Sequence, residues 1–394
     1  MRSGVNKILS SACPSWLVPH RPVNPGRSPR ASLAPDLGLD PPVLRSLRLM
    51  DFRCFRALDI EAPEAGTILV GHNAQGKTSI LEAICVLIRL HSPRTHRMGT
   101  LARVDGTGGF GIAGDPWGLE RQVRHSREGM LLKANEEERA GKSAYLEDGG
   151  LVVWMGNEDL DLIRGPGEGR RRYLDFIGAQ VEKRYRRAWT RYRRALQSKN
   201  LLLKEGRPRD AEILSYEEIM VEHGAVLMEV RARLVEELTP LAAEAQQSVG
   251  GGNEALTLQY LPASGPDLRQ SILHAREREL RMRQAVVGPH RDDLGLRLHG
   301  MPAADFASEG QQRTIALALK LAQGRLLEAR GGRTPIYLMD DIFGELDPNR
   351  RNALMAHLPA GAQKWITTTH LDWLSETTDT GSLARVTVSG GSCR

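Results

Sequence analysis

One stretch of eight residues has the types and spacing that hold phosphate groups. The sequence GHNAQGKT, from Gly71 to Thr78, fits the pattern G-x-x-x-x-G-K-[ST] at every fixed position. Gly71 and Gly76 let the backbone turn tightly, so that successive N–H groups can face phosphate oxygens. Lys77 is expected to reach the β- and γ-phosphates and to act in catalysis, and Thr78 to hold Mg²⁺. We therefore predict that the whole loop binds a nucleotide through Gly71, His72, Asn73, Ala74, Gln75, Gly76, Lys77 and Thr78.

An aspartate pair after an apolar run supplies the acidic groups that such a site needs. In PIYLMDD, residues 336–339 are suited to a parallel strand that is covered on both faces. Asp340 and Asp341 then emerge at its carboxyl end, where open α/β sheets bind ligands. We predict Asp340 as the acid associated with Mg²⁺. Asp341 is placed to orient or deprotonate the attacking water.

A third segment, ASEGQQ at residues 307–312, begins an apolar helix in an unusual way. Ser308 is a candidate N-cap, and Gln311 completes the spacing of a capping box. Gly310 is left unexplained, because glycine in a helix costs roughly 1 kcal/mol relative to alanine. Its presence in the first turn raises the question of whether something binds there.

Two further residues follow the aspartate pair in the chain. Asp347, in GELD, is a candidate N-cap for the helix that Pro348 begins. His370 ends KWITTTH, at the carboxyl end of another expected strand. A lone histidine there is more often structural than catalytic, but its order after the aspartate pair favours contact with the γ-phosphate.

The elements that must position these residues can be placed from hydrophobic periodicity. Two strands are expected between residues 43 and 63, a strand at 68–70, and a helix at 77–90. Short strands of an antiparallel sheet are expected across 108–155, and helices over 171–248 with a break at GRPRDAEI. Helices 309–330 and 348–357 should each lead into a strand, at 335–339 and 364–368. These segments predict an α/β fold.

Composition sets broad limits on the class of protein. The 394 residues are 41% hydrophobic and 26% charged, which is ordinary for a folded soluble chain, and the net charge of +6 permits an anionic partner. No apolar run is long enough to cross a membrane. The four scattered cysteines are expected as free thiols in a reducing cytoplasm. Residues 1–42, rich in Pro, Ser and Arg, are expected to be disordered, or to precede a true start near Val43.

The order of these motifs resembles that of an ATP-binding-cassette ATPase. The resemblance implies an ATPase head with a mixed sheet, a phosphate loop, an antiparallel β region and an inserted helical arm. In that family the Ser-Gly-Gln segment of one subunit closes over ATP held by another. It thus implies that Ser308, Gly310, Gln311 and Asp347 contact nucleotide in an ATP-dependent homodimer.

Within that superfamily the chain resembles the RecF family of recombination mediators. The segments that carry the resemblance are DFRCFRALDI, VGHNAQGKTSILEAI, NEDLDLIRGPGEGRRRYLDF, VVGPHRDDL, ASEGQQRTIALALKLAQ and LMDDIFGELDPNRR. It implies a cytoplasmic repair protein that uses ATP and Mg²⁺, hydrolyses ATP slowly, clamps gapped DNA as a dimer, and works with RecR and RecO to load RecA. It also implies ATPase parts at 43–170 and 286–394 flanking a helical arm at 171–285. Asn157 departs from the family pattern, in which proline is common, so no glutamine-loop residue is assigned.

Basic residues in the expected arm are candidates for DNA contact or for an ordinary solvated helix face. The candidates for phosphate contact are Arg170, Arg171, Arg184, Arg187, Arg191 and Arg194. Tyr185, Trp189 and Tyr192 could stack on bases, but their spacing favours the buried face of a helix.

Two other functions share the ATPase motifs. A membrane-transporter ATPase typically has a much shorter interval between the phosphate loop and the Ser-Gly-Gln segment. A chromosome-structuring head needs very long heptad coils, and residues 171–248 are far too short for these. The repair function is therefore favoured.

Overall fold

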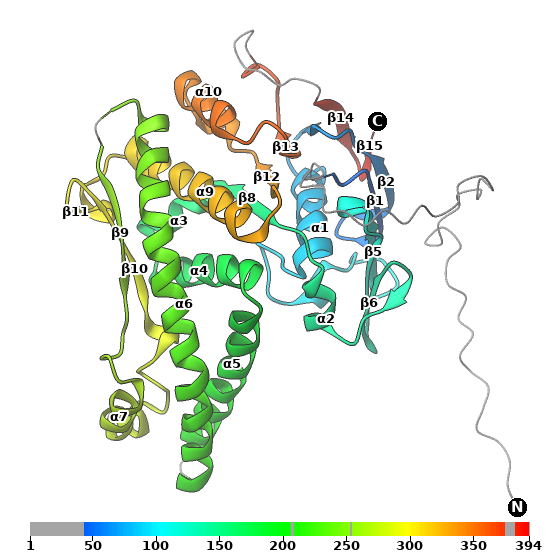
Figure 1. Ribbon diagram of the computed structural model, residues 1–394. Coiled ribbons are helices and arrows are strands. Elements are labelled where there is room, and N and C mark those ends of the chain that lie inside the picture. The colour runs from blue at the N-terminus through cyan, green and yellow to red at the C-terminus, as the bar shows by residue number, and fades with distance from the viewer. Residues whose placement is uncertain (1–42, 206–208, 253, 375–382, 394) are drawn as a thin grey trace, which may run out of the picture. The chain divides into compact units, whose positions relative to one another are not determined.

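The computed structural model describes residues 43–205, 209–252, 254–374 and 383–393 (Figure 1). The expectations for residues 1–42 lie outside this part of the chain. The strands are β1 (Ser46–Phe52), β2 (Phe55–Glu61), β3 (Gly66–Val70), β4 (Phe110–Gly114), β5 (Arg121–Ser126), β6 (Gly129–Ala134), β7 (Glu137–Glu138), β8 (Val152–Gly156), β9 (Leu256–Leu261), β10 (Asp293–Leu298), β11 (Met301–Pro302), β12 (Ile336–Asp340), β13 (Lys364–Thr368), β14 (Ala384–Ser389) and β15 (Ser392–Cys393).

The helices are interspersed among these strands along the chain. They are α1 (Lys77–Arg89), α2 (Lys142–Glu147), α3 (Asp161–Arg164), α4 (Gly167–Val181), α5 (Lys183–Lys204), α6 (Asp210–Gly250), α7 (Leu268–Met282), α8 (Ala303–Phe306), α9 (Glu309–Gly331) and α10 (Pro348–His357). Short 3₁₀ turns are η2 (Met98–Leu101), η3 (Pro116–Gly118), η4 (Asn157–Leu160), η5 (Pro289–Arg291) and η6 (Phe343–Glu345). The predicted helices after the phosphate loop, at 309–330 and at 348–357 are confirmed.

A central sheet carries the segments that matter most for the site. Its order is β15-β14-β3-β13-β12-β8, and all neighbours from β14 to β8 run parallel. The predicted apolar strand before the aspartate pair is confirmed as β12, which is central and buried. The carboxyl ends of β3, β12 and β13 therefore meet at one edge of the sheet. Open α/β sheets bind their ligands at this edge.

The assignment of residues 108–155 to one antiparallel sheet was wrong at its end. β4 to β7 do belong to an antiparallel sheet of order β2-β1-β4-β5-β6-β7. β8 instead pairs in parallel with β12. The physical reason lies in its residues: all five are buried, so β8 has the continuous apolar pattern of a strand covered on both faces.

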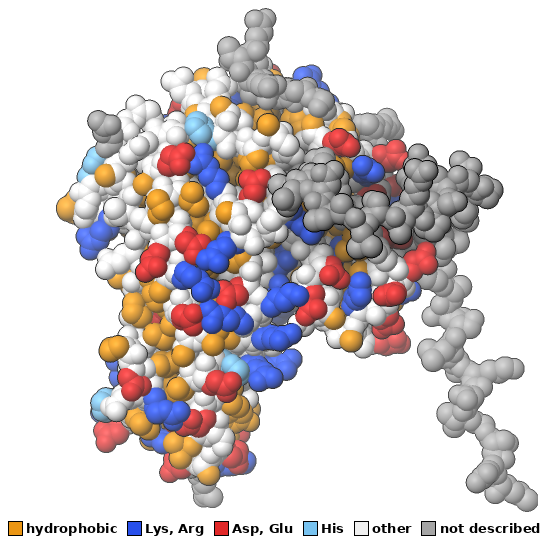
Figure 2. Space-filling view, viewed as in Figure 1, with side chains coloured by type: hydrophobic (Ala, Val, Ile, Leu, Met, Phe, Trp, Pro, Cys, Tyr) orange, Lys and Arg blue, Asp and Glu red, His pale blue; other side chains and the backbone are white. Residues whose placement is uncertain are grey.

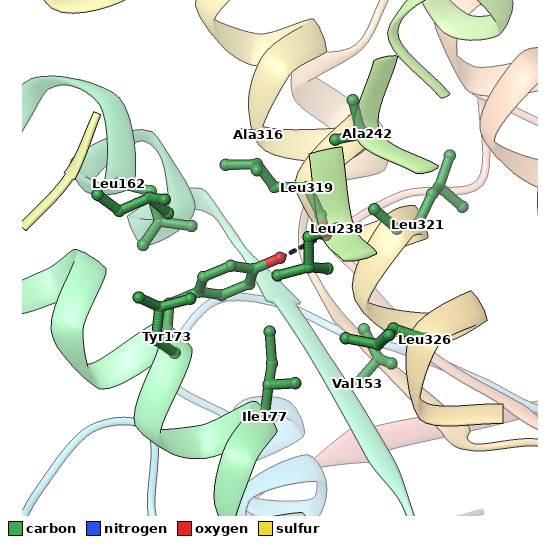
Figure 3. Close-up of a cluster of buried hydrophobic side chains, with 14 of the residues drawn as sticks. Val153, Leu162, Tyr173, Ile177, Leu238, Ala242, Ala316, Leu319, Leu321 and Leu326 are labelled. Atoms are coloured by element: carbon green, nitrogen blue, oxygen red, sulfur yellow. Dashed lines mark hydrogen bonds between the residues drawn. The ribbon is translucent and has the colours of Figure 1, made fainter. Parts of the chain in front are cut away.

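Alternating side chains of the central sheet enter two separate cores. Val152, Trp154 and Leu338 pack with α1 and the antiparallel sheet. Val153 and Met339 point the other way and pack with α4, α6 and α9. Figure 3 shows this second core, in which the Tyr173 hydroxyl donates to the Leu319 carbonyl oxygen over 2.7 Å. The central sheet is thus held rigidly between helices on both sides.

The predicted helical region is built from α4, α5, α6 and α7, with the division expected at residue 170 falling inside α4. α6 packs along both α5 and α9. Tyr185 and Tyr192 are almost fully buried on the inner face of α5, and Trp189 is partly buried, so the preference for core packing over base stacking is confirmed for the two tyrosines. A small antiparallel sheet, β11-β10-β9, was not predicted.

Two expectations from composition can be compared with the described residues. Cys54, Cys85 and Cys393 are free thiols there, whereas Cys13 lies outside them. No helix in the described part of the chain has the length and apolar character needed to span a membrane.

Candidate functional site

The phosphate loop joins the end of β3 to the start of α1, as predicted. Gly76 has φ 108°, in the left-handed region, and a Cβ there would lie 2.6 Å from Cys54 Sγ and 2.6 Å from a ring carbon of Phe55. Both backbone strain and space therefore require glycine at this position. The loop delivers the N-terminal end of α1, with its unpaired N–H groups, to the sheet edge.

Lys77 is folded back over the loop. Its ammonium donates to the carbonyl oxygens of Gly71, at 2.6 Å, and His72, at 2.9 Å. Burial lowers the pKa of Lys77, while the nearby charges of Asp341 and Asp340 raise it. The arrangement holds a cation at the mouth of the loop, between its carbonyls and the acidic strand end.

Asp340 connects the loop to the sheet through two hydroxyls. Its Oδ1 accepts hydrogen bonds from Thr78 Oγ1 and from Thr367 Oγ1, each at 2.8 Å. Burial raises the pKa of Asp340, against the lowering effect of both hydroxyls. The Thr78 hydroxyl and the Asp340 carboxylate thus form a pair of hard oxygen donors next to the loop.

Asp341 has the strained geometry that is common at functional sites. Its φ is 52°, in the left-handed region, and its backbone N–H donates to Thr367 Oγ1 over 2.9 Å. Burial raises the pKa of Asp341, and the positive charges of Lys77 and His370 oppose that shift.

A cleft of about 630 Å³ opens over these groups. Among the residues that the structure describes, those lining the cleft are Arg53, Cys54, Asn73, Ala74, Gln75, Gly76, Lys77, Thr78, Ser79, Arg94, Thr100, Ala102, Arg103, Val104, Asp105, Asp340, Asp341 and Thr367. The volume is within the range of small-molecule sites. The structure therefore brings together the predicted loop, Asp340 and Asp341 in one cleft. Neither His370 nor Ser308 is among the described residues that line the cleft. The His370 side chain is 52% exposed.

The Ser-Gly-Gln segment lies at the N-terminus of α9, where Ser308 is exposed and Gly310 and Gln311 are half-buried. Ser308 Oγ accepts from the Gln311 N–H, and Gln311 Oε1 accepts from the Ser308 N–H, so the predicted capping box is confirmed. Gln311 also donates to Glu254 Oε1 over 2.8 Å. Asp347 caps α10 as predicted, by accepting from the Arg350 N–H. The Ser308 side chain is thus exposed at the start of α9, and it is not among the described residues that line the cleft.

Several residues of the site could not be found from the sequence. Thr367 bridges the two aspartates from the neighbouring strand β13. Asn157, just past β8, donates weakly to the Asp341 carbonyl oxygen over 3.5 Å, and the charge of Glu158 raises the pKa of Asp340. These residues come together only through strand pairing, which no local motif encodes.

Two other supports of the loop were also missed. Arg53 donates to both oxygens of the buried Glu82 on α1, at 2.7 and 2.8 Å. The hairpin β14–β15 reaches the loop, where the Gly390 N–H donates to Gln75 Oε1 over 2.6 Å. Each contact joins residues that are far apart in the chain.

The predicted basic residues divide into two groups. Arg170 makes two hydrogen bonds to Asp293, at 2.7 and 2.8 Å, and Arg171 donates to the Asp292 carbonyl oxygen. Arg184 is paired with Glu182 and Glu229. The others, Arg187, Arg191 and Arg194, are exposed on α5, and Arg187 also lies 3.8 Å from Glu147 of α2 in an exposed ion pair. Figure 2 shows Lys and Arg side chains gathered over α4 and along α5.

Comparison with solved structures defines the class of protein first. The fold is that of an ATP-binding-cassette type ATPase head with a helical arm. The Smc head domain from Pyrococcus furiosus matches with a TM-score of 0.50 and 18% identity, over 90% of this chain and 95% of that one, which supports the fold alone. An AAA domain family also matches residues 46–128.

Comparison with curated relatives then defines the family. The DNA replication and repair protein RecF of Rippkaea orientalis is 35% identical over an alignment of 365 positions, which covers 83% of this chain and 93% of the relative. The RecF protein of Gloeobacter violaceus is 36% identical, over 85% of this chain and 95% of the relative. A solved structure of the recombination mediator RecF with ATP has a TM-score of 0.81 and 26% identity, over 91% of this chain and 98% of that one. The chain belongs to the RecF family of DNA replication and repair proteins, which confirms the resemblance.

Proposed function

We propose that this chain is a DNA repair ATPase whose binding to gapped DNA is controlled by ATP. The observation that carries the proposal is the meeting of Thr78, Asp340 and Lys77 at one sheet edge, in a chain of the RecF family. A RecF structure with ATP supports a nucleotide as the ligand of this cleft. The basic face of α5 supports an anionic polymer as the partner.

The residues of the cleft fit ATP with Mg²⁺. The loop N–H groups and the end of α1 would surround the phosphates, and Lys77 would exchange its contacts with the Gly71 and His72 carbonyls for phosphate oxygens. No group of three or more His, Cys, Asp or Glu side chains in the described residues could form a metal cage of its own. This agrees with Mg²⁺, which usually takes one or two protein ligands together with phosphates and water. Thr78 Oγ1 and the Asp340 carboxylate would be those ligands.

Hydrolysis would depend on Asp341 and on a second copy of the chain. Asp341 would orient the attacking water or accept its proton, and His370, whose charge acts on Asp341, would contact the γ-phosphate. The exposed Ser308 and the half-buried Gly310 lie at the positive end of α9. They would therefore close over the nucleotide of the partner in an ATP-dependent homodimer. Slow hydrolysis, weakly stimulated by DNA, would release the dimer.

The DNA face would be the exposed side of α5. Arg187, Arg191 and Arg194 have the exposure needed for phosphate contact. Arg170, Arg171 and Arg184 are engaged by groups of the same chain, so we assign them a supporting part. Contacts of this kind are independent of sequence, which suits a protein that recognises a gap. By family, the complex would act in the cytoplasm with RecR and RecO to load RecA; a RecF structure is described in the RecFOR pathway.

The test is binding to gapped duplex DNA with and without ATP–Mg²⁺, across a salt series, beside the variant Ser308→Arg. We expect affinity to rise with ATP and to lose that dependence in the variant. Replacing Arg187, Arg191 and Arg194 by Gln should lower the slope of log K against log salt by up to about 3, since each phosphate contact contributes roughly 0.9. A wild type that binds ATP but shows no ATP-dependent affinity for DNA would refute the proposal.

A further inference from the structure

Arg350, on α10, lies against the start of α9 and outside the cleft. Its Nε donates to Thr314 Oγ1 over 2.8 Å, and its Nη1 contacts Asp347 Oδ2 at 2.5 Å. Thr314 in turn donates to the Gly310 carbonyl oxygen over 3.0 Å. A chain of hydrogen bonds thus runs from Asp347 through Arg350 and Thr314 to Gly310.

The guanidinium also occupies the space beside Gly310. A Cβ on Gly310 would lie 3.1 Å from Arg350 Nη2 and 3.5 Å from Nη1. A side chain at position 310 would therefore press on Arg350 and tend to displace it. This is a reason within the chain itself for glycine in the first turn of α9.

An ordinary surface ion pair does not explain this arrangement. Arg350 and Asp347 are three residues apart at a helix start, and exposed pairs of that kind contribute at most about 1 kcal/mol. The bond to Thr314 is different, because Thr314 belongs to another helix and is fully buried. In addition, a cation at the N-terminal end of α9 opposes the helix dipole. The planar guanidinium bridges Asp347 and Thr314 through two of its nitrogen atoms. Lysine has a single ammonium group and lacks this fork of donors.

We propose that Arg350 is a positioning residue that fixes the Ser308–Gln311 turn to the Asp347 turn. The inference rests on the proposed function, in which both turns meet the nucleotide of the partner. The Asp347 turn follows Asp340 and Asp341 closely in the chain. Arg350 therefore links the turn that follows the acidic pair to the start of α9.

The test is a double-mutant cycle on the ATP-dependent dimerisation constant, measured by sedimentation in an Asp341→Asn background to stop turnover. The variants are Arg350→Gln, Thr314→Val and the two combined, with Thr314→Ser as a control that keeps the hydroxyl. We expect Arg350→Gln and Thr314→Val each to weaken the dimer about tenfold, as for loss of a hydrogen bond to a charged group. The combined variant should be little weaker than either single one. The affinity of the monomer for ATP should stay within about twofold, and Arg350→Lys should recover only part of the loss.

The outcomes distinguish failure of the proposed function from failure of the inference about Arg350. If the parent protein stays monomeric with ATP, the proposed function fails and the inference fails with it. If the parent dimerises and Arg350→Gln dimerises equally well, only the inference is refuted. Effects that multiply in the combined variant would also refute it, since Arg350 would then act independently of Thr314. Normal dimerisation in Thr314→Ser separates loss of the hydroxyl from a general defect in folding.

Discussion

At the residue scale, the site depends on two aspartates whose carboxyl pKa values burial raises, one of which also has a left-handed backbone. Asp341 combines a left-handed backbone with a carboxyl group whose pKa burial raises. Asp340 is buried and depends on two hydroxyls. Such perturbed groups in a cleft are typical of catalytic sites.

The first prediction concerns Asp341 and pH. The carboxylate must be ionised to accept a proton, so hydrolysis should be present at neutral pH and lost as the pH falls through the pKa of Asp341. Because burial raises that pKa, the loss should begin at a higher pH than for an ordinary aspartate. Asp341→Asn should lower kcat by about 10²-fold or more and trap the dimer. The measurement is kcat against pH for both proteins; an acid limb that persists unchanged in the variant would assign it to another group.

The second prediction concerns Thr367, which joins both aspartates. Thr367→Val should leave the backbone N–H of Asp341 and one lone pair of Asp340 unsatisfied. At about 1–3 kcal/mol, this should reduce kcat roughly 5- to 100-fold with little change in ATP affinity. Thr367→Ser keeps the hydroxyl and should retain most activity. Equal kcat in the Val and Ser variants would show that the hydroxyl has no such part.

At the element scale, local patterns were predictable and long-range pairings were not. The phosphate loop, the aspartate pair at the end of β12 and the Ser308 capping box are encoded within a few residues each, and the structure contains all three elements. The place of β8 in the central sheet depends on pairing with β12 across a long stretch of chain. Thr367 and Arg350 reach their partners in the same way, through packing of neighbouring elements. Their roles could not be read from periodicity or motifs.

The third prediction contrasts two cations of helix α5. Lys199 is fully buried and pairs with Glu217 at 3.0 Å and Glu279 at 2.5 Å, so it joins α5 to α6 and α7. Lys199→Met should lower the free energy of unfolding by about 3–5 kcal/mol, because it leaves two buried carboxylates without their cation. Arg191 is exposed, and Arg191→Gln should change unfolding by less than about 0.5 kcal/mol.

The two variants are compared by urea unfolding and by DNA binding at several salt concentrations. Arg191→Gln should reduce the salt dependence of binding and leave stability intact. A large loss of stability from Arg191→Gln would place it in the structure of the arm rather than on its DNA face.

At the scale of the whole molecule, the proposed function requires one chain to hold two unlike halves of a nucleotide site. The cleft gathers Lys77, Thr78, Asp340 and Asp341, whereas Ser308 is exposed at the start of another helix. Under the proposed function, an assembly of two copies would complete both sites. The central claim is therefore that each site is built from two chains.

The most direct measurement is ATP hydrolysis by a mixture of two inactive variants. Lys77→Ala has a defective phosphate loop and an intact Ser308 segment, and Ser308→Arg has the reverse. In a mixed dimer one site would be complete, so the mixture should hydrolyse ATP although neither variant does so alone. Mixing at rising protein concentration should increase the rate steeply. A mixture that remains as inactive as its components, while Ser308→Arg alone still binds ATP, would contradict a site shared between two chains.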